Sequence, residues 1–394
     1  MSKNKVNTKT LSGFAELLPE QQRAFDSIRG KIEEVFRARG FQNMDTPAVE
    51  RAEILFSKTG GEINKEIFRV LHGDTEQALR FDLTVPFARY VAEHNHDLVF
   101  PFKRNAIGKS WRGERAQRGR AREFYQADID TVAENGLPLA YDAEIILTIA
   151  GALSATVGRP FKVHVSSRRI WGELVFNAPL MTLIDKKRKI TADEFERSLK
   201  ELAGDDCPRV RNILAGKVVT PDLEEVLSLL PRDLSVFDPT IIRGLDYYTG
   251  TVFETFLDGD DSLGSIASGG RYENLVGNFS DRNIVGVGGS IGLTRYFLTA
   301  VLEGKIQATA SPLTLVIPTR KEYVTRAFSL GCGILFLEKK LGKLFEIANR
   351  MGATRVVVIG DDEMKNGTLT LKDMATGEQL TAKFEDVAAM LKKH

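Results

Sequence analysis

The sequence contains 394 residues, of which 43% are hydrophobic and 27% are charged. A chain of this length can bury more than one core, so we expect two or three domains. Its 54 basic and 53 acidic residues nearly balance, which excludes a protein that binds nucleic acid through its overall charge. Any contact with RNA must therefore be local.

The first predicted element is a helix over residues 20–39. Its apolar residues recur at helical spacing on one face, and Gly40 follows as a stop signal. These apolar residues are Phe25, Ile28, Ile32, Val35 and Phe36.

No segment predicts insertion into a membrane. The first ten residues carry charge but lead into no apolar stretch, which argues against a secretory signal. The longest uncharged run begins at Ile145 and stops before Arg159, which is too short to span a bilayer. We expect this run to be a core helix of a soluble, cytoplasmic protein.

Residues 103–122 form a strongly basic segment, in which eight lysines and arginines accompany a single acid, Glu114. The local charge is about +7, whereas the formal net charge of the chain is only +1. For an arbitrary basic run, a solvated surface face is the more common explanation. A binding role is favoured because Phe124 and Tyr125 follow with flat rings on which a base could stack. The next residues alternate as a strand whose polar face carries Gln126, Asp128 and Asp130.

Residues 243–254 read RGLDYYTGTVFE and place an obligate cation beside two phenols and a carboxylate. The guanidinium of Arg243 suits a phosphate, because it cannot be deprotonated and offers several donors. Asp246, Tyr247 and Tyr248 suit a small polar ligand. The two clusters together indicate a site for a phosphate-bearing ligand and a small polar one.

Two further regions differ in character from the rest of the chain. Within residues 165–235, the run DKKRKITADEFERSLKEL predicts an amphipathic helix. A surface appendage without chemistry and a clamp on RNA are both open interpretations of this region. From residue 312 onward, strand and helix patterns alternate, which predicts a small separate domain with a largely parallel sheet.

Other nucleotide-binding and metal-binding classes find little support. The sequence contains no G-x-x-x-x-G-K-[ST] run, and GVGGSIG at 286–292 lacks the spacing of a dinucleotide-binding loop. Cys207 and Cys332 are too few and too distant for a zinc site or a disulfide framework, so we expect no structural metal. The five histidines are scattered, and we interpret them as structural or exposed.

Four runs of the sequence resemble histidyl-tRNA synthetase, a class II aminoacyl-tRNA synthetase. They are RFDLTVPFAR (80–89), WRGERAQRGRAREFYQ (111–126), IIRGLDYYTGTVFE (241–254) and the segment 268–295 that ends in Arg295. Their order and spacing also match the family, and the similarity covers nearly the whole chain. The resemblance implies an enzyme that activates L-histidine with ATP and Mg²⁺ and then transfers it to tRNA(His).

The resemblance also implies an α+β architecture. Residues 1–304 would form the class II catalytic domain around an antiparallel sheet, with a helical insertion at about 165–235. A linker at 305–311 would lead to a small α/β domain at 312–394 that resembles an anticodon-binding domain. The first helix and the segment GFQNMDTPAVER after it resemble motif 1 of the class, whose helix and strand form the interface of a homodimer, and Pro47 would lie in that strand.

The family's functional residues can be placed on this sequence by motif. Arg112 and Arg243 would stabilise the reacting α-phosphate, and Arg115 and Gln117 would meet the acceptor end of tRNA. ATP would contact Arg112, Glu114, Arg120, Phe124 and Arg295, with adenine between Phe124 and Arg295. Histidine would contact Asp82, Leu83, Thr84, Gln126, Asp130, Tyr247, Tyr248 and Tyr272. Within that set, Asp130, Tyr248 and Tyr272 would surround the imidazole ring.

Some residues depart from the family pattern. Ala116 and Ala121 stand where a proline and a tyrosine are common, which affects how the acceptor end is recognised. The stretch 322–345 lacks about ten residues relative to the family, which predicts a shortened last domain. Two alternatives remain: a non-catalytic paralogue such as the regulatory subunit of ATP phosphoribosyltransferase, and a histidine-sensing RNA-binding module.

Overall fold

A computed structural model describes residues 6–57, 65–117, 119–187, 190–242, 247–260, 263–303 and 312–392. By its internal contacts the chain divides into two compact units, residues 1–16 with 28–308 and residues 17–27 with 309–394. The predicted linker at 305–311 lies outside the described residues.

The first unit is built on an eight-stranded sheet in the order β1-β5-β6-β11-β10-β9-β7-β8. Only the outer pairs β1–β5 and β7–β8 are parallel, and every other pairing in this sheet is antiparallel. The long central strands are β5 (Phe102–Trp111), β6 (Glu123–Glu134) and β11 (Ile284–Ile291). The other strands are β1 (Gln42–Asn43), β7 (Phe161–Ser167), β8 (Ser235–Phe237), β9 (Thr251–Leu257) and β10 (Ala267–Tyr272).

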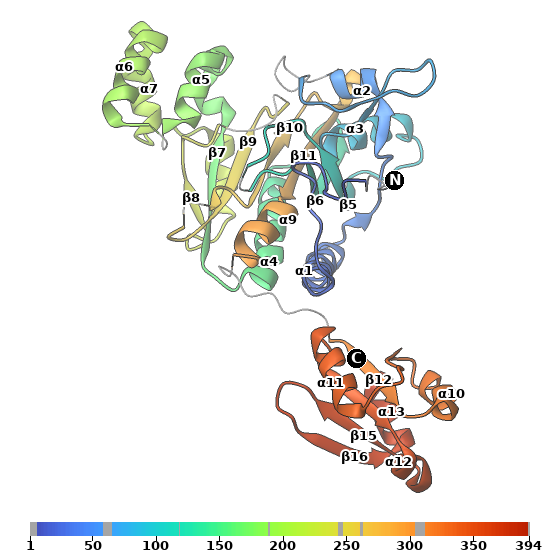
Figure 1. Ribbon diagram of the computed structural model, residues 1–394. Helices are drawn as coiled ribbons and strands as arrows, with labels where there is room; N and C mark the ends of the chain where they lie inside the picture. Colours follow the sequence, from blue (N-terminus) through green and yellow to red (C-terminus); the bar gives the residue numbers. More distant parts are fainter. Residues whose placement is uncertain are drawn as a thin grey trace. The chain divides into compact units, whose positions relative to one another are not determined.

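Helix α4 (Ala140–Val157) packs against this sheet, as Figure 1 shows. It is long and apolar enough to cross a membrane by length and composition, but 56% of it is buried inside the protein. Ile145 and Ile149 are fully buried, in agreement with the core helix predicted from the uncharged run. They lie against Gly289 of β11, whose missing side chain lets the helix approach.

Helix α1 (Pro19–Ala38) confirms the predicted first helix. Phe25, Ile28, Ile32 and Phe36 are buried, and the helix ends before Gly40, which has a φ of +82°. A positive φ costs glycine little, so the chain can turn sharply there. The strand predicted around Pro47 is wrong, because this residue lies between β1 and β2 (Val49–Arg51).

A smaller three-stranded sheet, in the order β2-β4-β3, lies beside α2 (Ala52–Phe56) and α3 (Thr84–Glu93). Its other strands are β3 (Arg69–Val70) and β4 (Gln77–Leu79). The loop between β4 and α3 is held to the main sheet at Arg80, which donates to the Lys109 carbonyl of β5 and accepts from the Trp111 amide.

The segment between β7 and β8 is helical. It holds two 3-10 turns within Arg168–Phe176, separated by a kink at Gly172, and then α5 (Ala178–Asp185), α6 (Ala192–Ala203), α7 (Cys207–Leu214) and α8 (Pro221–Ser228). The amphipathic run predicted as a single helix is interrupted. Its helix α6 starts only at Ala192, because the Thr191 side chain accepts a hydrogen bond from the Glu194 amide and caps it.

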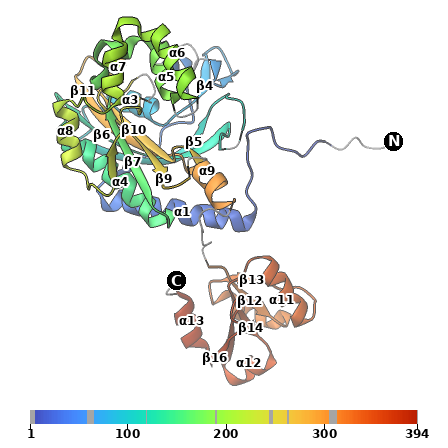
Figure 2. The same ribbon diagram turned by 90° about the vertical axis from the view of Figure 1, so that its left-hand side faces the viewer.

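The second unit has its own five-stranded sheet in the order β13-β12-β14-β15-β16 (Figure 2). Its strands are β12 (Thr314–Pro318), β13 (Gly333–Ile334), β14 (Arg355–Ile359), β15 (Thr368–Asp373) and β16 (Gln379–Lys383). The expected largely parallel sheet is only half right, since β14–β15 and β15–β16 are antiparallel. A short turn joins β15 to β16, and a connection of that length allows only antiparallel pairing.

Helices cover both faces of this second sheet. Alternate residues of β12 and β14 pack on α11 (Leu341–Arg350) through Leu344 and Ala348. The other residues of these strands pack with Ala327 of α10 (Val324–Phe328) and Val387 of α13 (Phe384–Lys392). A further helix, α12 (Asp361–Asn366), links β14 to β15. Within residues 322–345, the stretch predicted to be shorter than in the family, α10 spans five residues and β13 only two.

Candidate active site

The floor of the site follows from the register of three central strands. Gln126, Asp128 and Asp130 alternate along β6, so their side chains rise from one face. Asp128 lies opposite Ala106 of β5 and Ser290 of β11. Both neighbours of Asp128 are small, which leaves its side chain open to a ligand.

Two glycines of β11 make room for the acidic end of this floor. A Cβ on Gly288 would stand 2.1 Å from Asp130 Oδ1, and a Cβ on Gly286 would stand 2.2 Å from the Tyr272 ring. Neither separation is possible without displacing the neighbouring side chain. The glycines of the GVGGSIG run therefore allow close packing on this floor and do not form a phosphate-binding loop.

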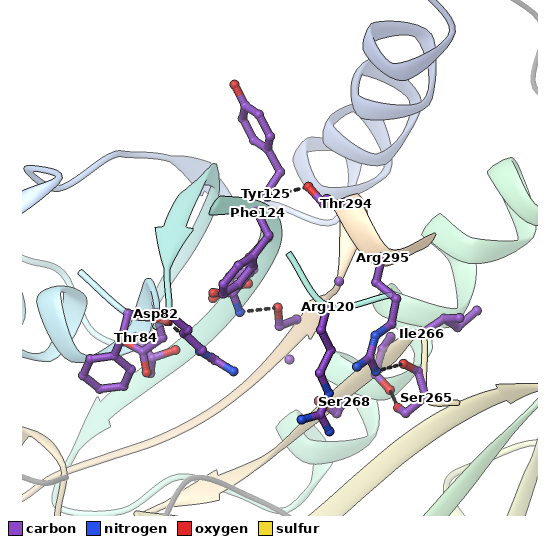
Figure 3. A pocket seen from close by; sticks show the side chains of 18 of the residues that line it. Asp82, Thr84, Arg120, Phe124, Tyr125, Ser265, Ile266, Ser268, Thr294 and Arg295 are labelled. Atoms are coloured by element: carbon purple, nitrogen blue, oxygen red, sulfur yellow. Dashed lines mark hydrogen bonds between the residues drawn. The ribbon is translucent and has the colours of Figure 1, made fainter. Parts of the chain in front are cut away.

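Above this floor lies a cavity of about 420 Å³. In the view of Figure 3, Asp82 and Thr84 lie on one side of it, Arg120 and Arg295 lie on the other, and Phe124 stands between them. The cavity gathers residues from segments far apart in the sequence. The predicted site residues that line it are Asp82, Thr84, Arg112, Glu114, Arg120, Phe124, Gln126, Asp130, Tyr247, Tyr248 and Arg295.

Asp130 is held by two partners behind the cavity wall. Its Oδ1 accepts a hydrogen bond of 2.8 Å from the Tyr272 hydroxyl, and its Oδ2 pairs at 2.8 Å with Arg104 Nη2. Arg104 is 1% exposed, donates to the Leu83 carbonyl at 2.9 Å, and lies over the Phe87 ring. Leu83 and Tyr272, which were predicted to contact histidine, therefore support the wall through Arg104 and Asp130 and do not line the cavity.

Asp82 caps the first turn of α3. Its Oδ1 accepts from the Val85 amide at 3.0 Å, and its Oδ2 accepts from the Tyr247 hydroxyl at 3.3 Å. Tyr247 packs edge to face against Tyr248, with ring centroids 4.9 Å apart. These contacts place a buried carboxylate and two phenols at the same end of the cavity as Asp130.

Burial dominates the electrostatics of this end. Loss of hydration raises the pKa of Asp82 and Asp130, and it raises the pKa of Asp128 to about 7. Arg104 partly opposes the rise for Asp128 and Asp130, whereas the Val85 amide is the main opposing influence at Asp82. Three buried carboxyl groups near few cations suit a ligand that brings positive charge and N–H donors.

The buried phenols carry the complementary property. Burial raises the pKa of Tyr247, Tyr248 and Tyr272 above its ordinary value, and the nearby aspartates act in the same direction. These hydroxyls therefore stay protonated and can donate hydrogen bonds.

The other end of the cavity is rich in guanidinium groups. Arg112 Nε donates to the Phe81 carbonyl at 3.0 Å, and its guanidinium lies 5.2 Å from the centroid of the Phe124 ring. Arg120 pairs with Glu114 at 2.8 Å. Arg295 Nε donates to the Gly119 carbonyl at 2.9 Å, which ties the end of α9 (Leu293–Arg295) to the loop after β5.

Some predicted residues lie elsewhere. Arg115 and Gln117 are exposed in the loop between β5 and β6 and do not line the cavity, although the backbone of Gln117 bonds that of Arg120. Arg243 and Asp246 lie outside the described residues, as does Arg118.

Sequence reasoning missed several residues of the site. Asp128 lines the cavity, and its place on the polar face of the strand was already visible in the sequence. Glu254 ends the RGLDYYTGTVFE run and also lines the cavity. Ser290 and Arg104 could not be found from motifs, because their positions depend on the pairing of β6 with its two neighbours.

Comparison with known proteins agrees with this geometry. The family model of histidyl-tRNA synthetase matches residues 13–235 and 218–295, and that of the anticodon binding domain matches residues 332–394. The histidine–tRNA ligase of Clostridium acetobutylicum is 39% identical over 98% of this chain and 100% of its own length. The Clostridium tetani ligase is 36% identical over 100% of both chains.

A solved structure extends the agreement to three dimensions. The crystal structure of histidyl-tRNA synthetase from Nostoc sp. PCC 7120 superposes with a TM-score of 0.85 at 31% identity, covering 99% of this chain and 100% of that chain. The predicted α+β class, with its separate α/β domain, is thereby confirmed. This chain belongs to the histidyl-tRNA synthetase family.

Proposed function

We propose that this protein activates L-histidine with ATP and transfers the histidyl group to tRNA(His). One observation carries the proposal: a single cavity joins a buried acidic and phenolic end to an end lined by arginines and Phe124. An amino acid with an ammonium group and an imidazole ring suits the first end. A nucleoside triphosphate suits the end lined by arginines and Phe124.

At the acidic end, Asp82, Thr84 and Gln126 bind the α-ammonium group of histidine. Asp130 and Tyr248 bind the two ring nitrogens of the imidazole, while Tyr272 and Arg104 hold the Asp130 carboxylate in place. An apolar amino acid of similar size would leave these buried groups without partners. Such a loss disfavours the competitor strongly, which gives selectivity.

At the basic end, the adenine ring stacks between Phe124 and Arg295. Arg112 and Arg243 contact the α-phosphate, Glu114 lies near the adenine amine, and Arg120 extends toward the γ-phosphate. Mg²⁺ arrives with ATP as part of the substrate. Glu114 pairs with Arg120, and binding of ATP would exchange this ion pair for contacts with the nucleotide.

The reaction needs no general base, because the carboxylate of histidine is already ionised at neutral pH. A carboxylate oxygen forms a bond to the α-phosphorus while the bond from that phosphorus to the pyrophosphate oxygen breaks. Pyrophosphate leaves with the electron pair, and histidyl-adenylate remains. The arginines stabilise the charge that builds on the phosphate in the transition state. A hydroxyl of the terminal ribose of tRNA then attacks the histidyl carbonyl and releases AMP.

The remaining assignments belong to the same proposal. Residues 1–304 form the catalytic domain, with the insertion at about 165–235, and residues 312–394 form a domain that contacts the anticodon. The acceptor end of tRNA lies near Arg115 and Gln117, which are exposed in the loop between β5 and β6. The protein acts as a cytoplasmic homodimer.

The test is exchange of labelled pyrophosphate into ATP by the purified protein. We expect exchange with L-histidine and none with L-phenylalanine or L-glutamine, and we expect charging of tRNA(His). An Arg243→Ala variant provides the control, because it should lower turnover on the order of 100-fold while leaving histidine affinity nearly unchanged. Absence of histidine-dependent exchange would exclude the proposal and favour a non-catalytic paralogue or a sensing module.

A further inference from the structure

Two buried acceptor atoms on the cavity floor have no hydrogen-bond partner. They are Asp128 Oδ1 and Gln126 Oε1, and the two residues rise from neighbouring positions on the same face of β6. Asp128 is 2% exposed, and both residues line the cavity. A buried acceptor without a partner costs free energy, so these atoms point to a ligand that supplies N–H donors.

The Ser290 hydroxyl fixes the orientation of both side chains. Gln126 Nε2 donates a hydrogen bond of 3.0 Å to Ser290 Oγ, and Ser290 lies directly opposite Asp128 in the pairing of β11 with β6. Because Ser290 Oγ accepts from the Gln126 amide, the serine proton is left for another acceptor, and the Asp128 carboxylate opposite it is one. The bond from the amide nitrogen also turns Gln126 Oε1 away from the serine.

Asp128 differs in this respect from the other carboxylates of the pocket. Both oxygens of Asp130 are already engaged, by Tyr272 and by Arg104. Both oxygens of Asp82 are also engaged, by the Val85 amide and by Tyr247. Asp128 alone among these three keeps a buried oxygen without a partner.

We infer that Asp128 is a further histidine-binding residue, whose Oδ1 accepts a hydrogen bond from the α-ammonium group together with Gln126 Oε1. Ser290 is the positioning residue that holds the two acceptors toward the ligand. This inference rests on the proposed function and adds a residue to its amino-acid site. The α-ammonium group fits because it carries three N–H donors and a positive charge, whereas a neutral imidazole carries one donor.

The charge of Asp128 should respond to such a ligand. Burial raises its pKa to about 7, and the groups that face it are Asp82, Asp130, Arg104 and Ser290. A bound ammonium group would favour the ionised form and offset this effect.

The test compares two imidazole ligands that differ only in the amine. Histamine keeps the ring and the ammonium group, whereas 4-ethylimidazole keeps the ring alone. Their affinities for the full-length protein are measured by titration calorimetry. Asp128→Ala and the isosteric Asp128→Asn should weaken histamine on the order of 10- to 100-fold and change 4-ethylimidazole less than about 2-fold. Ser290→Ala should show the same selectivity for histamine with a smaller loss.

Asp130→Asn is the matched control on the same strand face, and it should weaken both ligands because Asp130 faces the ring. Equal losses for both ligands in the Asp128 variants, or no loss for either, would overturn the inference. The inference is also overturned if the wild-type protein binds neither ligand. Failure of the proposed function gives a different result from failure of this inference. In that case the wild-type protein binds histamine but shows no histidine-dependent exchange of pyrophosphate. Unchanged affinity for ATP in each variant verifies the fold.

Discussion

Replacement of Arg104 by methionine should destabilise the first unit and the histidine pocket together. Arg104 pairs with Asp130 at 2.8 Å, and the two residues are 1% and 2% exposed. At an effective dielectric constant of about 20, this separation corresponds to about 6 kcal/mol of attraction, which mainly offsets the cost of burying both charges. Removing the arginine alone leaves a buried carboxylate without its counter-ion. We therefore expect a loss of about 3–5 kcal/mol in the free energy of unfolding.

The loss should depend on pH. Burial already raises the pKa of Asp130, and loss of Arg104 removes the main influence that lowers it. Between the ordinary pKa of the unfolded state and the raised pKa of the folded state, only the native protein holds the extra proton. Stability of the variant should therefore fall as pH rises through that interval. We expect a larger loss at pH 8 than at pH 5.5.

The assay is denaturant unfolding followed by tryptophan fluorescence. The chain has two tryptophans, Trp111 and Trp171, and both belong to the first unit, so the signal does not include unfolding of the second. The double variant Arg104→Met/Asp130→Asn removes both charges. Its loss in the free energy of unfolding should be about 2–3 kcal/mol smaller than the sum of the losses in the two single variants. Arg115→Met, at an exposed position, should stay within about 0.5 kcal/mol of wild type. A loss below about 1 kcal/mol for Arg104→Met, or strictly additive losses in the double variant, would refute this reasoning.

Three other predictions concern single residues of the cavity. Asp128→Asn should stabilise the ligand-free protein over wild type more at pH 8 than at pH 4.5. The reason is that a pKa raised from 3.8 to about 7 costs the wild-type native state up to about 4 kcal/mol once the carboxyl ionises. Equal effects at both pH values in denaturant unfolding would contradict this prediction. Gly288→Ala should weaken histidine binding by calorimetry far more than ATP binding, because its Cβ would meet Asp130 Oδ1 at 2.1 Å; equal losses for both substrates would count against this. Phe124→Ala should raise the KM for ATP about 10- to 100-fold through lost stacking, with the KM for histidine nearly unchanged, and a change confined to histidine would move the adenine site elsewhere.

The parts of the site that the sequence predicts are those set by local pattern. The alternation of Gln126, Asp128 and Asp130 is a property of one strand, and it survives into the structure without change. The burial of Ile32 and Phe36 on one side of α1 follows from helical spacing in the same way. Motifs then add identity to these patterns, which is how residues from distant segments could be assigned to one cavity.

The parts that could not be predicted depend on how strands pair. The loop at residues 112–122 between β5 and β6 is long, so no tight turn fixes their register, and the pairing of Arg104 with Asp130 is not visible in the sequence. The role of Tyr272 could not be predicted for the same reason. This residue lies on β10, which β11 separates from β6, and its hydroxyl reaches Asp130 across β11. In the second unit, strand patterns alone do not say whether β15 runs parallel or antiparallel to β14.

The hydrogen bond from Arg112 Nε to the Phe81 carbonyl has a consequence for selectivity. Phe81 directly precedes Asp82, so one peptide group separates the anchor of the guanidinium proposed to bind the α-phosphate from a carboxylate proposed to bind the amino acid. On this proposal, a wrong amino acid that pushes Asp82 aside will also shift Arg112 away from the α-phosphate. Small displacements of this kind slow a reaction that depends on alignment. Rejection of near-cognate amino acids should therefore appear in the rate of adenylate formation as well as in binding.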